Sequence, residues 1–425
     1  MKRIAALMLV LVLAMASLAG CGGNQQGGGE GSKAEEVKKP ELKDYGSGEI
    51  KIWVANEVLD FTKQKAEEFI AAHEAYKGYT IAVEEVGEGD AAGKMITDVD
   101  AGADIFGFAQ DQLARLVSTG AVSPALWDAA WITEQNDALS VGAATMGGTI
   151  YAYPVTSDNG YFMYYDKSVI TDPSSLDKIL EQCEKAGKSF YMEINSGWYQ
   201  TAFFFAAGCK MDFTANDEGG FTAADMTYAS EGGVNALKAM IKLAESPAFV
   251  NGSSVSAAAN AAAVVSGTWD SGAAKELFGD NYAAVKLPTA NIGGKDVQLS
   301  GFGGFKLMGV KPQTEEGKLV VCKELAQYLT SEEVQLARYE AVGWGPSNKK
   351  AQGNEAIKND VALSAIRDQL QYTIPQGQYP GDYWGLATSL GDSVIAGEFK
   401  GKSDADLMKA LEDFQNTCLS YVTAK

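Results

Sequence analysis

Apolar and polar positions follow two periods along the chain from residue 49 onward, one typical of strands and one typical of helices. Residues 49–54 and 79–86 alternate as strands do, whereas the apolar residues of 61–76 recur at helical spacing. A short helix is expected over 93–100 and a compact apolar strand over 103–108. This strand–helix order within about 60 residues predicts parallel βαβ units.

The carboxyl ends of these strands mark where a ligand is expected, because ligands of parallel sheets lie beyond those ends. The first strand ends just before Asn56 and Glu57, and the third ends at Phe108, shortly before Asp111. We therefore expect a site around 56–57 and 108–111.

A second run of strands and helices fills the rest of the chain and contains no internal repeat. The roughly 375 residues of the body fit two domains or one large α/β unit. Strands are expected over 149–155, 160–165, 190–194, 282–287 and 303–310, and helices over 198–207, 315–339 (split near 330), 384–396 and 404–419.

The N-terminus has the pattern of an export signal. Lys2 and Arg3 precede an apolar stretch over 4–16 that is too short to span a bilayer as a mature helix. The sequence Leu-Ala-Gly then leads into Cys21, which resembles the lipobox of bacterial lipoproteins. We expect a signal peptide over 1–20, lipidation at Cys21, and a body anchored to the outer face of the cell membrane. The alternative is an ordinary secretory signal with a chance cysteine.

Composition predicts a tether between the anchor and the body. Residues 22–32 are glycine, glutamine, asparagine and serine with one glutamate, and 33–40 are mostly charged. Such segments cannot bury enough apolar surface to fold. We expect a flexible tether over 21–47 and a folded body from 48.

The net charge and the scarcity of histidine limit which ligands and which catalytic sites the chain can have. The net charge of −20 argues against nucleic acid and anionic lipid headgroups as partners, and leaves neutral and cationic ligands open. His73 is the single histidine, so a multi-histidine metal site is excluded and a Ser-His-Asp triad would have to use His73 itself. We expect no metal and no cofactor, and an enzyme would be restricted to a carboxylate pair, as in glycosidases.

Cysteines carry no metal-ligand spacing either. The four that follow Cys21 are read as buried thiols, although an exported protein can also form disulfides. They are Cys183, Cys209, Cys322 and Cys418.

Several short motifs occur along the chain in a fixed order. They are Ile50–Asn56 (IxIWxxN), Ala103–Phe106, Gly148–Pro154, Val264–Trp269, Leu287–Thr289 and Asp382–Trp384. In this order they resemble the extracellular solute-binding proteins of ABC importers, and most closely the maltose/maltodextrin-binding branch. The resemblance extends from about residue 48 to the end of the chain.

The resemblance implies an α/β, two-lobe periplasmic-binding-protein fold (type II, Venus-flytrap) with a hinge and an interlobe cleft. It places the N-terminal lobe at 48–156 plus 303–359 and the C-terminal lobe at 157–302 plus 360–425. Crossings near 155–159 and 299–304 would be hinge strands that absorb the rotation of closure.

The resemblance also assigns cleft residues. A neutral oligosaccharide packs its pyranose faces on aromatic rings and pairs its hydroxyls with carboxylates and amides. Gln112 stands where the family often has arginine, and Glu57 aligns loosely with an acidic position. The remaining candidates are the aromatic residues Trp198, Trp269, Trp384 and Phe108 and the acids Asp111 and Asp158; Trp344, between two glycines, fits the cleft or the core equally.

Structural alternatives accompany several of these residues. Asp111 and Asp158 would also suit solvated turns, and an aspartate can cap the helix that starts near Gln112. Trp53, inside a strand, is read as a core residue.

These expectations combine into one leading hypothesis. The protein captures a maltooligosaccharide by cleft closure and delivers it to an ABC permease, acting as a lipid-anchored monomer with no enzymatic activity. The alternatives are another neutral oligosaccharide as ligand, an exported glycoside hydrolase, and a surface adhesin.

Overall fold

The computed structural model describes residues 37–422, and of these residues 38–422 form one compact unit. The expected signal peptide, the lipidation site Cys21 and most of the tether lie outside the described residues. Within 37–422, no helix has both the length and the apolar character that a membrane span requires.

The first sheet confirms the predicted parallel βαβ units. Strand β1 pairs in parallel with β2 on one side and with β3 on the other, and β16 runs antiparallel to β3. The order is β17-β16-β3-β1-β2, and β6 also pairs with β16. The strands are β1 (Gly48–Val54), β2 (Tyr79–Glu85), β3 (Ile105–Ala109), β6 (Ala152–Asn159), β16 (Phe302–Val310) and β17 (Ile374–Pro375).

Alternation along β1 gives this sheet two buried faces. Ile50, Ile52 and Val54 pack in one apolar cluster with Phe69 of helix α2 (Leu59–Ala72). Trp53 points to the opposite face and is 8% exposed, which confirms it as a core residue. Its indole N–H donates to Glu84 Oε2 at 2.8 Å, so its polar atom is also satisfied.

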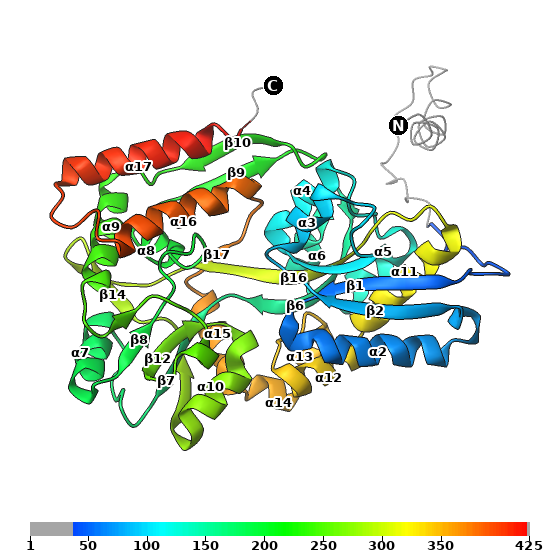
Figure 1. The fold of residues 1–425 in the computed structure, drawn as a ribbon, viewed down its shortest axis with the longest axis horizontal. Coiled ribbons are helices and arrows are strands. Elements are labelled where there is room, and N and C mark those ends of the chain that lie inside the picture. Colours follow the sequence, from blue (N-terminus) through cyan, green and yellow to red (C-terminus); the bar gives the residue numbers. More distant parts are fainter. Residues whose placement is uncertain (1–36, 423–425) are drawn as a thin grey trace, which may run out of the picture. The chain divides into compact units, whose positions relative to one another are not determined.

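The second sheet has the order β11-β8-β12-β7-β13 and helices on both faces (Figure 1). All four cysteines of the described part of the chain are buried free thiols, as expected. The strands are β7 (Phe162–Asp166), β8 (Ser189–Tyr191), β11 (Phe249–Val250), β12 (Ala261–Ser266) and β13 (Tyr282–Val285), and the helices around them are α7 (Leu176–Ala186), α8 (Thr201–Ala206), α9 (Glu231–Ala244), α10 (Ser271–Phe278), α15 (Val361–Leu370), α16 (Gly381–Ile395) and α17 (Asp404–Leu419).

Other elements fill the spaces around the two sheets. They comprise the helices α3 (Ala91–Thr97), α4 (Leu113–Ser118), α5 (Ala129–Gln135), α6 (Ala138–Ala143), α11 (Glu316–Leu329), α12 (Glu332–Val342), α13 (Lys349–Gln352) and α14 (Glu355–Lys358), and the hairpins β4–β5 (Thr145–Met146, Thr149–Ile150), β9–β10 (Met211–Ala215, Phe221–Met226) and β14–β15 (Thr289–Ile292, Lys295–Gln298).

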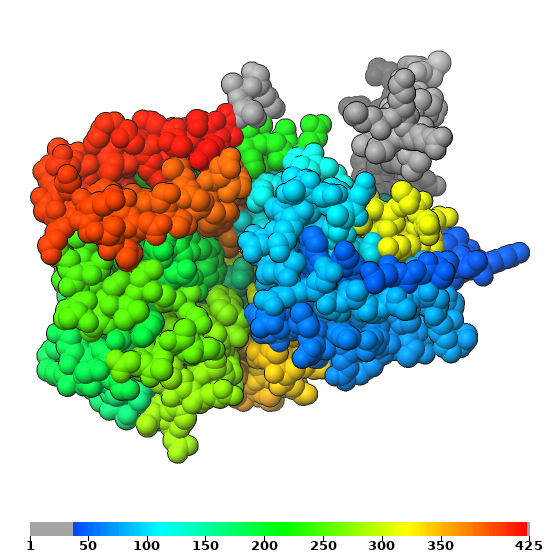
Figure 2. Space-filling model, in the orientation of Figure 1, coloured from blue at the N-terminus to red at the C-terminus, as the bar shows by residue number. Residues whose placement is uncertain are grey.

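The chain passes between the two sheets at three places. Two of them, where β6 leads to β7 and where β15 leads to β16, coincide with the crossings expected near 155–159 and 299–304. The third lies between α13 and α15, because α15 already packs on the second sheet, and it falls near the change of lobe expected at 359–360. After α15, the short strand β17 pairs in parallel with β16. The two groups of segments on either side of these crossings meet along a clear boundary in Figure 2. The exact lobe limits and the hinge motion stay predictions.

Part of the segment assigned to the tether, residues 38–47, makes contacts with the body. Tyr45 contacts the ring of Tyr76 edge to face at 5.1 Å, and its carbonyl oxygen accepts a hydrogen bond from Tyr79 Oη at 2.6 Å. Lys39 forms an ion pair with Glu324 of α11. The aromatic ring of Tyr45 supplies apolar contact that the charged composition of this segment did not suggest.

Candidate functional site

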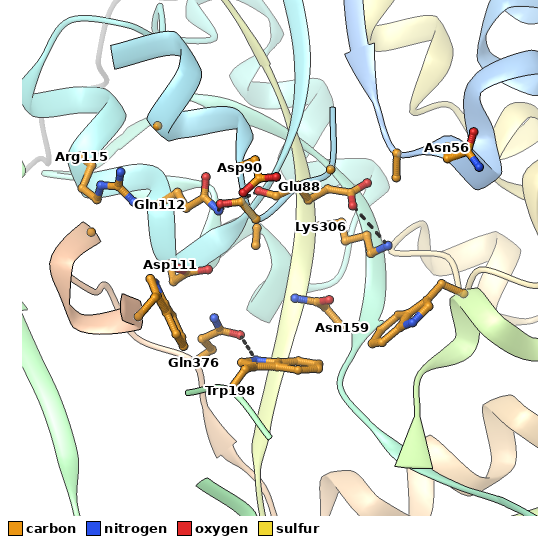
Figure 3. A pocket seen from close by; sticks show the side chains of 18 of the residues that line it. Asn56, Glu88, Asp90, Asp111, Gln112, Arg115, Asn159, Trp198, Lys306 and Gln376 are labelled. Atoms are coloured by element: carbon orange, nitrogen blue, oxygen red, sulfur yellow. Dashed lines mark hydrogen bonds and ion pairs between the residues drawn. The ribbon is translucent and has the colours of Figure 1, made fainter. Parts of the chain in front are cut away.

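A pocket of about 750 Å³ opens at the strand ends that the sequence singled out (Figure 3). Its wall on the side of the first sheet is formed by the segments that follow β1, β2 and β3, which is the position that parallel strands favour. Residues of β6 and β16, the residue after β17, and a group of tryptophans complete the lining. The lining side chains include Asn56, Glu57, Glu85, Glu88, Asp90, Asp111, Gln112, Arg115, Asn159, Trp198, Trp269, Lys306, Gln376 and Trp384.

Three of the predicted aromatic residues line this pocket. Trp198 precedes helix α8, Trp269 lies in the short helix η6 (Thr268–Asp270), and Trp384 is in the first turn of α16. All three indoles are half-buried, so each leaves part of its ring accessible to a ligand. The ring centroids of Trp198 and Trp269 are 5.9 Å apart and their planes differ by 44°.

The protein holds each indole in place. A Cβ atom at Gly267 would approach the Trp269 ring to 2.0 Å, so the ring occupies space that only glycine leaves free. The Trp198 indole N–H donates to Gln376 Oε1 at 3.2 Å. Trp384 packs on the rings of Tyr379 and Tyr383, at centroid distances of 5.3 and 4.9 Å. The indoles are therefore fixed before a ligand arrives, which lowers the entropic cost of binding.

Asp111 lies at the floor of the pocket and is 3% exposed, which rules out a solvated turn residue. It does not cap α4 either, because the N-cap of that helix is Gln112 and no side chain caps it. Burial raises the pKa of Asp111 from its usual 3.8 to about 7, against the opposing effects of a backbone hydrogen bond and the Arg115 charge.

The raised pKa of Asp111 predicts how stability depends on pH. Between about pH 4 and about 7 the folded protein keeps the Asp111 proton, whereas the unfolded chain has released it. The contribution of this proton to the free energy of unfolding is therefore complete at low pH and is lost as pH rises through about 7. We expect the free energy of unfolding of the wild type, relative to Asp111→Asn, to fall from pH 5 to pH 7 and then to level. Urea denaturation of both proteins at pH 5, 6, 7 and 8 measures this difference, and a constant difference would contradict the assignment.

Gln112 positions a loop of the pocket wall rather than reaching for a ligand. Its Nε2 donates to the carbonyls of Glu88 and Gly89 at 2.7 and 2.9 Å, and its Oε1 accepts from the Ala92 amide at 3.0 Å. The amide group is thus used in fixing the segment between β2 and α3.

Phe108 does not reach the pocket, contrary to the expectation for a cleft aromatic. It is fully buried in an apolar cluster, with its ring centroid 5.7 Å from that of Phe106. The strand continues by one residue, and Ala109 rather than Phe108 lines the pocket. Consecutive residues of a strand face opposite sides, which accounts for the correction.

Asp158 and Trp344 also lie outside this pocket and support its wall. Asp158 is 4% exposed, and its Oδ2 accepts hydrogen bonds from Thr268 Oγ1 and the Gly345 amide, both at 2.5 Å. It thereby ties β6 to the segment that carries Trp269. Trp344 is 3% exposed, in the core of the first sheet. The core alternative for Trp344 therefore fits the structure, and Asp158 serves a buried network.

Glu57, the loosest of the candidates, is exposed at the pocket rim in η1 (Asn56–Val58).

Several lining residues were not predicted. Glu88 and Asp90 follow the second strand, so the strand-end rule that selected Glu57 applies to them too. Lys306 is a lone cation in an otherwise apolar strand pattern, which is a usable signal. No sequence signal singled out Asn159 or Gln376 as a pocket residue.

The pocket favours a neutral, hydroxyl-rich ligand over an anion. Five carboxylates line it, against the two cations Arg115 and Lys306. Lys306 already faces a carboxylate, with its Nζ 3.7 Å from Glu88 Oε2. Within residues 37–422, no group of His, Cys, Asp and Glu side chains is arranged to hold a metal ion.

Comparison with known proteins identifies the family. The sequence profile described as bacterial extracellular solute-binding protein matches residues 66–365. A galactooligosaccharide-binding protein of Bacillus subtilis (strain 168) is 24% identical over 448 residues, covering 100% of this chain and 98% of the relative.

Solved structures share the fold. One determined with acarbose is 28% identical, with a TM-score of 0.76 over 89% of this chain and 100% of its own. The maltotriose-binding protein of Thermus thermophilus, bound with maltotriose, is 18% identical, with a TM-score of 0.73 over 88% of this chain and 100% of its own.

These similarities confirm the expected type II periplasmic-binding-protein fold. The function of such a protein is to bind a solute rather than to convert it. The chain belongs to the bacterial extracellular solute-binding proteins.

Proposed function

We propose that the protein captures a maltooligosaccharide in the pocket between the two sheets and delivers it to an ABC permease. The observation that carries this proposal is the row of three half-buried indoles beside buried and exposed carboxylates. Sugar rings offer apolar C–H faces to such indoles and hydroxyls to the carboxylates. The proposed contacts are Trp198, Trp269, Trp384, Asp111 and Glu57.

The tilt between adjacent indoles supports an α-1,4-linked glucan. Trp198 and Trp269 differ by 44° in plane at a centroid distance of 5.9 Å, so two successive sugar rings stacked on them would be tilted too. A linkage with one axial bond bends a glycan in this way, whereas the diequatorial linkage of a cello-oligosaccharide keeps successive rings in a flat ribbon. A bent chain matches the tilted indoles better.

A β-1,4-linked galactooligosaccharide is the second candidate. The Bacillus subtilis relative that aligns over the whole chain is named a galactooligosaccharide-binding protein, and a β-1,4 linkage is our choice for the test. Its linkage also contains one axial bond, so the tilted indoles fit it as well. The two candidates differ in how their hydroxyls are placed, and binding measurements separate them.

Isothermal titration calorimetry with maltotriose, β-1,4-galactotriose and cellotriose tests the proposal. We expect maltotriose to bind most tightly, galactotriose more weakly, and cellotriose to give no measurable heat. Tighter binding of galactotriose would replace the maltooligosaccharide assignment, and no binding of any sugar would remove oligosaccharides as ligands.

We further propose that Cys21 carries the lipid anchor and that the protein acts as a monomer. The lipobox-like Leu-Ala-Gly-Cys sequence supports the anchor. Fatty-acid labelling of cells that express the wild type or Cys21→Ser is the direct test. An equal label on both proteins would refute lipidation at this cysteine.

A further inference from the structure

Lys306 is a buried cation in the middle of a strand, at a point where the sheet is irregular. It pairs with Ala109 of β3 on one side and with Thr156 of β6 on the other. The register of β6 shifts on both sides of Thr156, so extra residues of β6 flank the position opposite Lys306. Such bulges often redirect a side chain near a site, and here the Lys306 ammonium reaches the pocket (Figure 3).

The surroundings hold the ammonium without satisfying its donors. Lys306 is 6% exposed, and its Nζ lies 3.5 Å from the ring centroid of Trp344 and 5.4 Å from that of Trp269. The carboxylate of Glu88 is 3.7 Å away, which balances the charge but is too long for a hydrogen bond. No acceptor within the described residues hydrogen-bonds to this ammonium. A buried donor without an acceptor is costly.

A second buried lysine, Lys323, has the hydrogen-bond acceptor that Lys306 lacks. Lys323 is fully buried over the ring of Trp127, at 5.6 Å from its centroid, and its Nζ donates to the carbonyl of Pro124 at 2.5 Å. Lys323 does not line the pocket. The difference between the two lysines is therefore the missing acceptor at Lys306, on the side that a ligand would occupy.

We propose that Lys306 and Glu88 together read an adjacent pair of hydroxyls on the sugar ring that stacks on Trp269. One hydroxyl oxygen accepts from the Lys306 ammonium, and the neighbouring hydroxyl donates to the Glu88 carboxylate. Charge-assisted hydrogen bonds of this kind are stronger than neutral ones. Glu88 also repels anionic groups, so the pair selects a neutral diol. This inference rests on the proposed function and adds the residues that determine specificity at one end of the pocket.

The test combines one substitution with a series of ligands. Lys306→Met keeps an unbranched side chain that is one heavy atom shorter and can still pack on Trp344, but it removes the donors. Affinity is measured by calorimetry for maltotriose and for maltotriose deoxygenated at O2 or O3 of one ring at a time. In the wild type we expect two deoxy analogues of one ring to bind about tenfold more weakly than maltotriose, one lacking the hydroxyl that faces Lys306 and one lacking the hydroxyl that faces Glu88. In Lys306→Met the analogue that lacks the Lys306-facing hydroxyl should bind this variant as tightly as maltotriose does.

Lys323→Met is the matched control, because it removes a buried ammonium over a tryptophan away from the pocket. It should lower the melting temperature and leave the sugar affinities and the deoxy profile unchanged. The assignment would be overturned if Lys306→Met bound maltotriose with wild-type affinity. It would also be overturned if the variant bound every sugar more weakly by the same factor, so that the deoxy analogues ranked as in the wild type. In both cases the proposed function stands. A wild type that binds none of the sugars would overturn the proposed function itself.

Discussion

Replacing Phe108 by alanine should destabilise the protein by about 3–5 kcal/mol, the usual cost of truncating a buried aromatic residue. Phe108 is fully buried in the cluster between the first sheet and its helices, so the change leaves a cavity that its neighbours cannot fill. Chemical denaturation of the variant measures the loss. The sugar affinity of the protein that remains folded should be close to that of the wild type.

Phe106→Ala is the matched control for this prediction, because Phe106 is also fully buried in the same strand and has no contact with the pocket. The two variants should lose similar stability and keep similar affinity. If Phe108→Ala instead melts like the wild type and binds sugar poorly, the ring belongs to the pocket and its placement in the core is wrong.

The misassignment of Phe108 shows where the sequence stops being informative. The strand Ile105–Ala109 lies in the middle of a sheet, and its first four residues are buried. Apolar runs of this kind do not reveal which face a residue occupies. The strand ends at Ala109, and the residue at which it ends decides whether Phe108 or Ala109 points into the pocket.

The position of the pocket, by contrast, followed from the strand order alone. Parallel strands must open their carboxyl ends on one edge of the sheet, so Glu57 and Asp111 were placed near each other without any knowledge of side-chain contacts. The same rule would have included Glu88, since it follows the next strand. The meeting of these strand ends at one edge of the sheet was therefore predictable, because the alternation of apolar and polar residues identified the strands clearly.

Residues whose partners are distant in sequence were not predictable. The role of Asp158 depends on the Gly345 amide, which is 187 residues away, and β17 pairs with β16 although helices α11 to α15 separate the two strands in the sequence. Helix α7 is different, because its Ser175 cap and the left-handed Gly187 after its last turn are local start and stop signals. Local signals of this kind are available to sequence analysis, whereas contacts across the fold are not.

The three indoles of the pocket should not respond equally to truncation. Trp384 packs on Tyr379 and Tyr383, at centroid distances of 5.3 and 4.9 Å, beside the core of the second sheet. Its loss would leave a cavity beside these buried rings, so Trp384→Ala should reduce both stability and affinity. This expectation differs from that for a freely exposed ring, and it makes Trp269 the better probe of stacking.

Trp269→Ala should weaken binding of the sugar by about 1–3 kcal/mol, or about 5–150-fold in Kd, because an aromatic contact to one sugar ring is lost. Trp269 is half-buried in the short helix η6 and rests on Gly267, so the melting temperature of the ligand-free protein should change little. Titration calorimetry and thermal melts of the same preparation measure both quantities. A variant that melts much earlier yet keeps its sugar affinity would place the Trp269 ring in the core instead of the pocket.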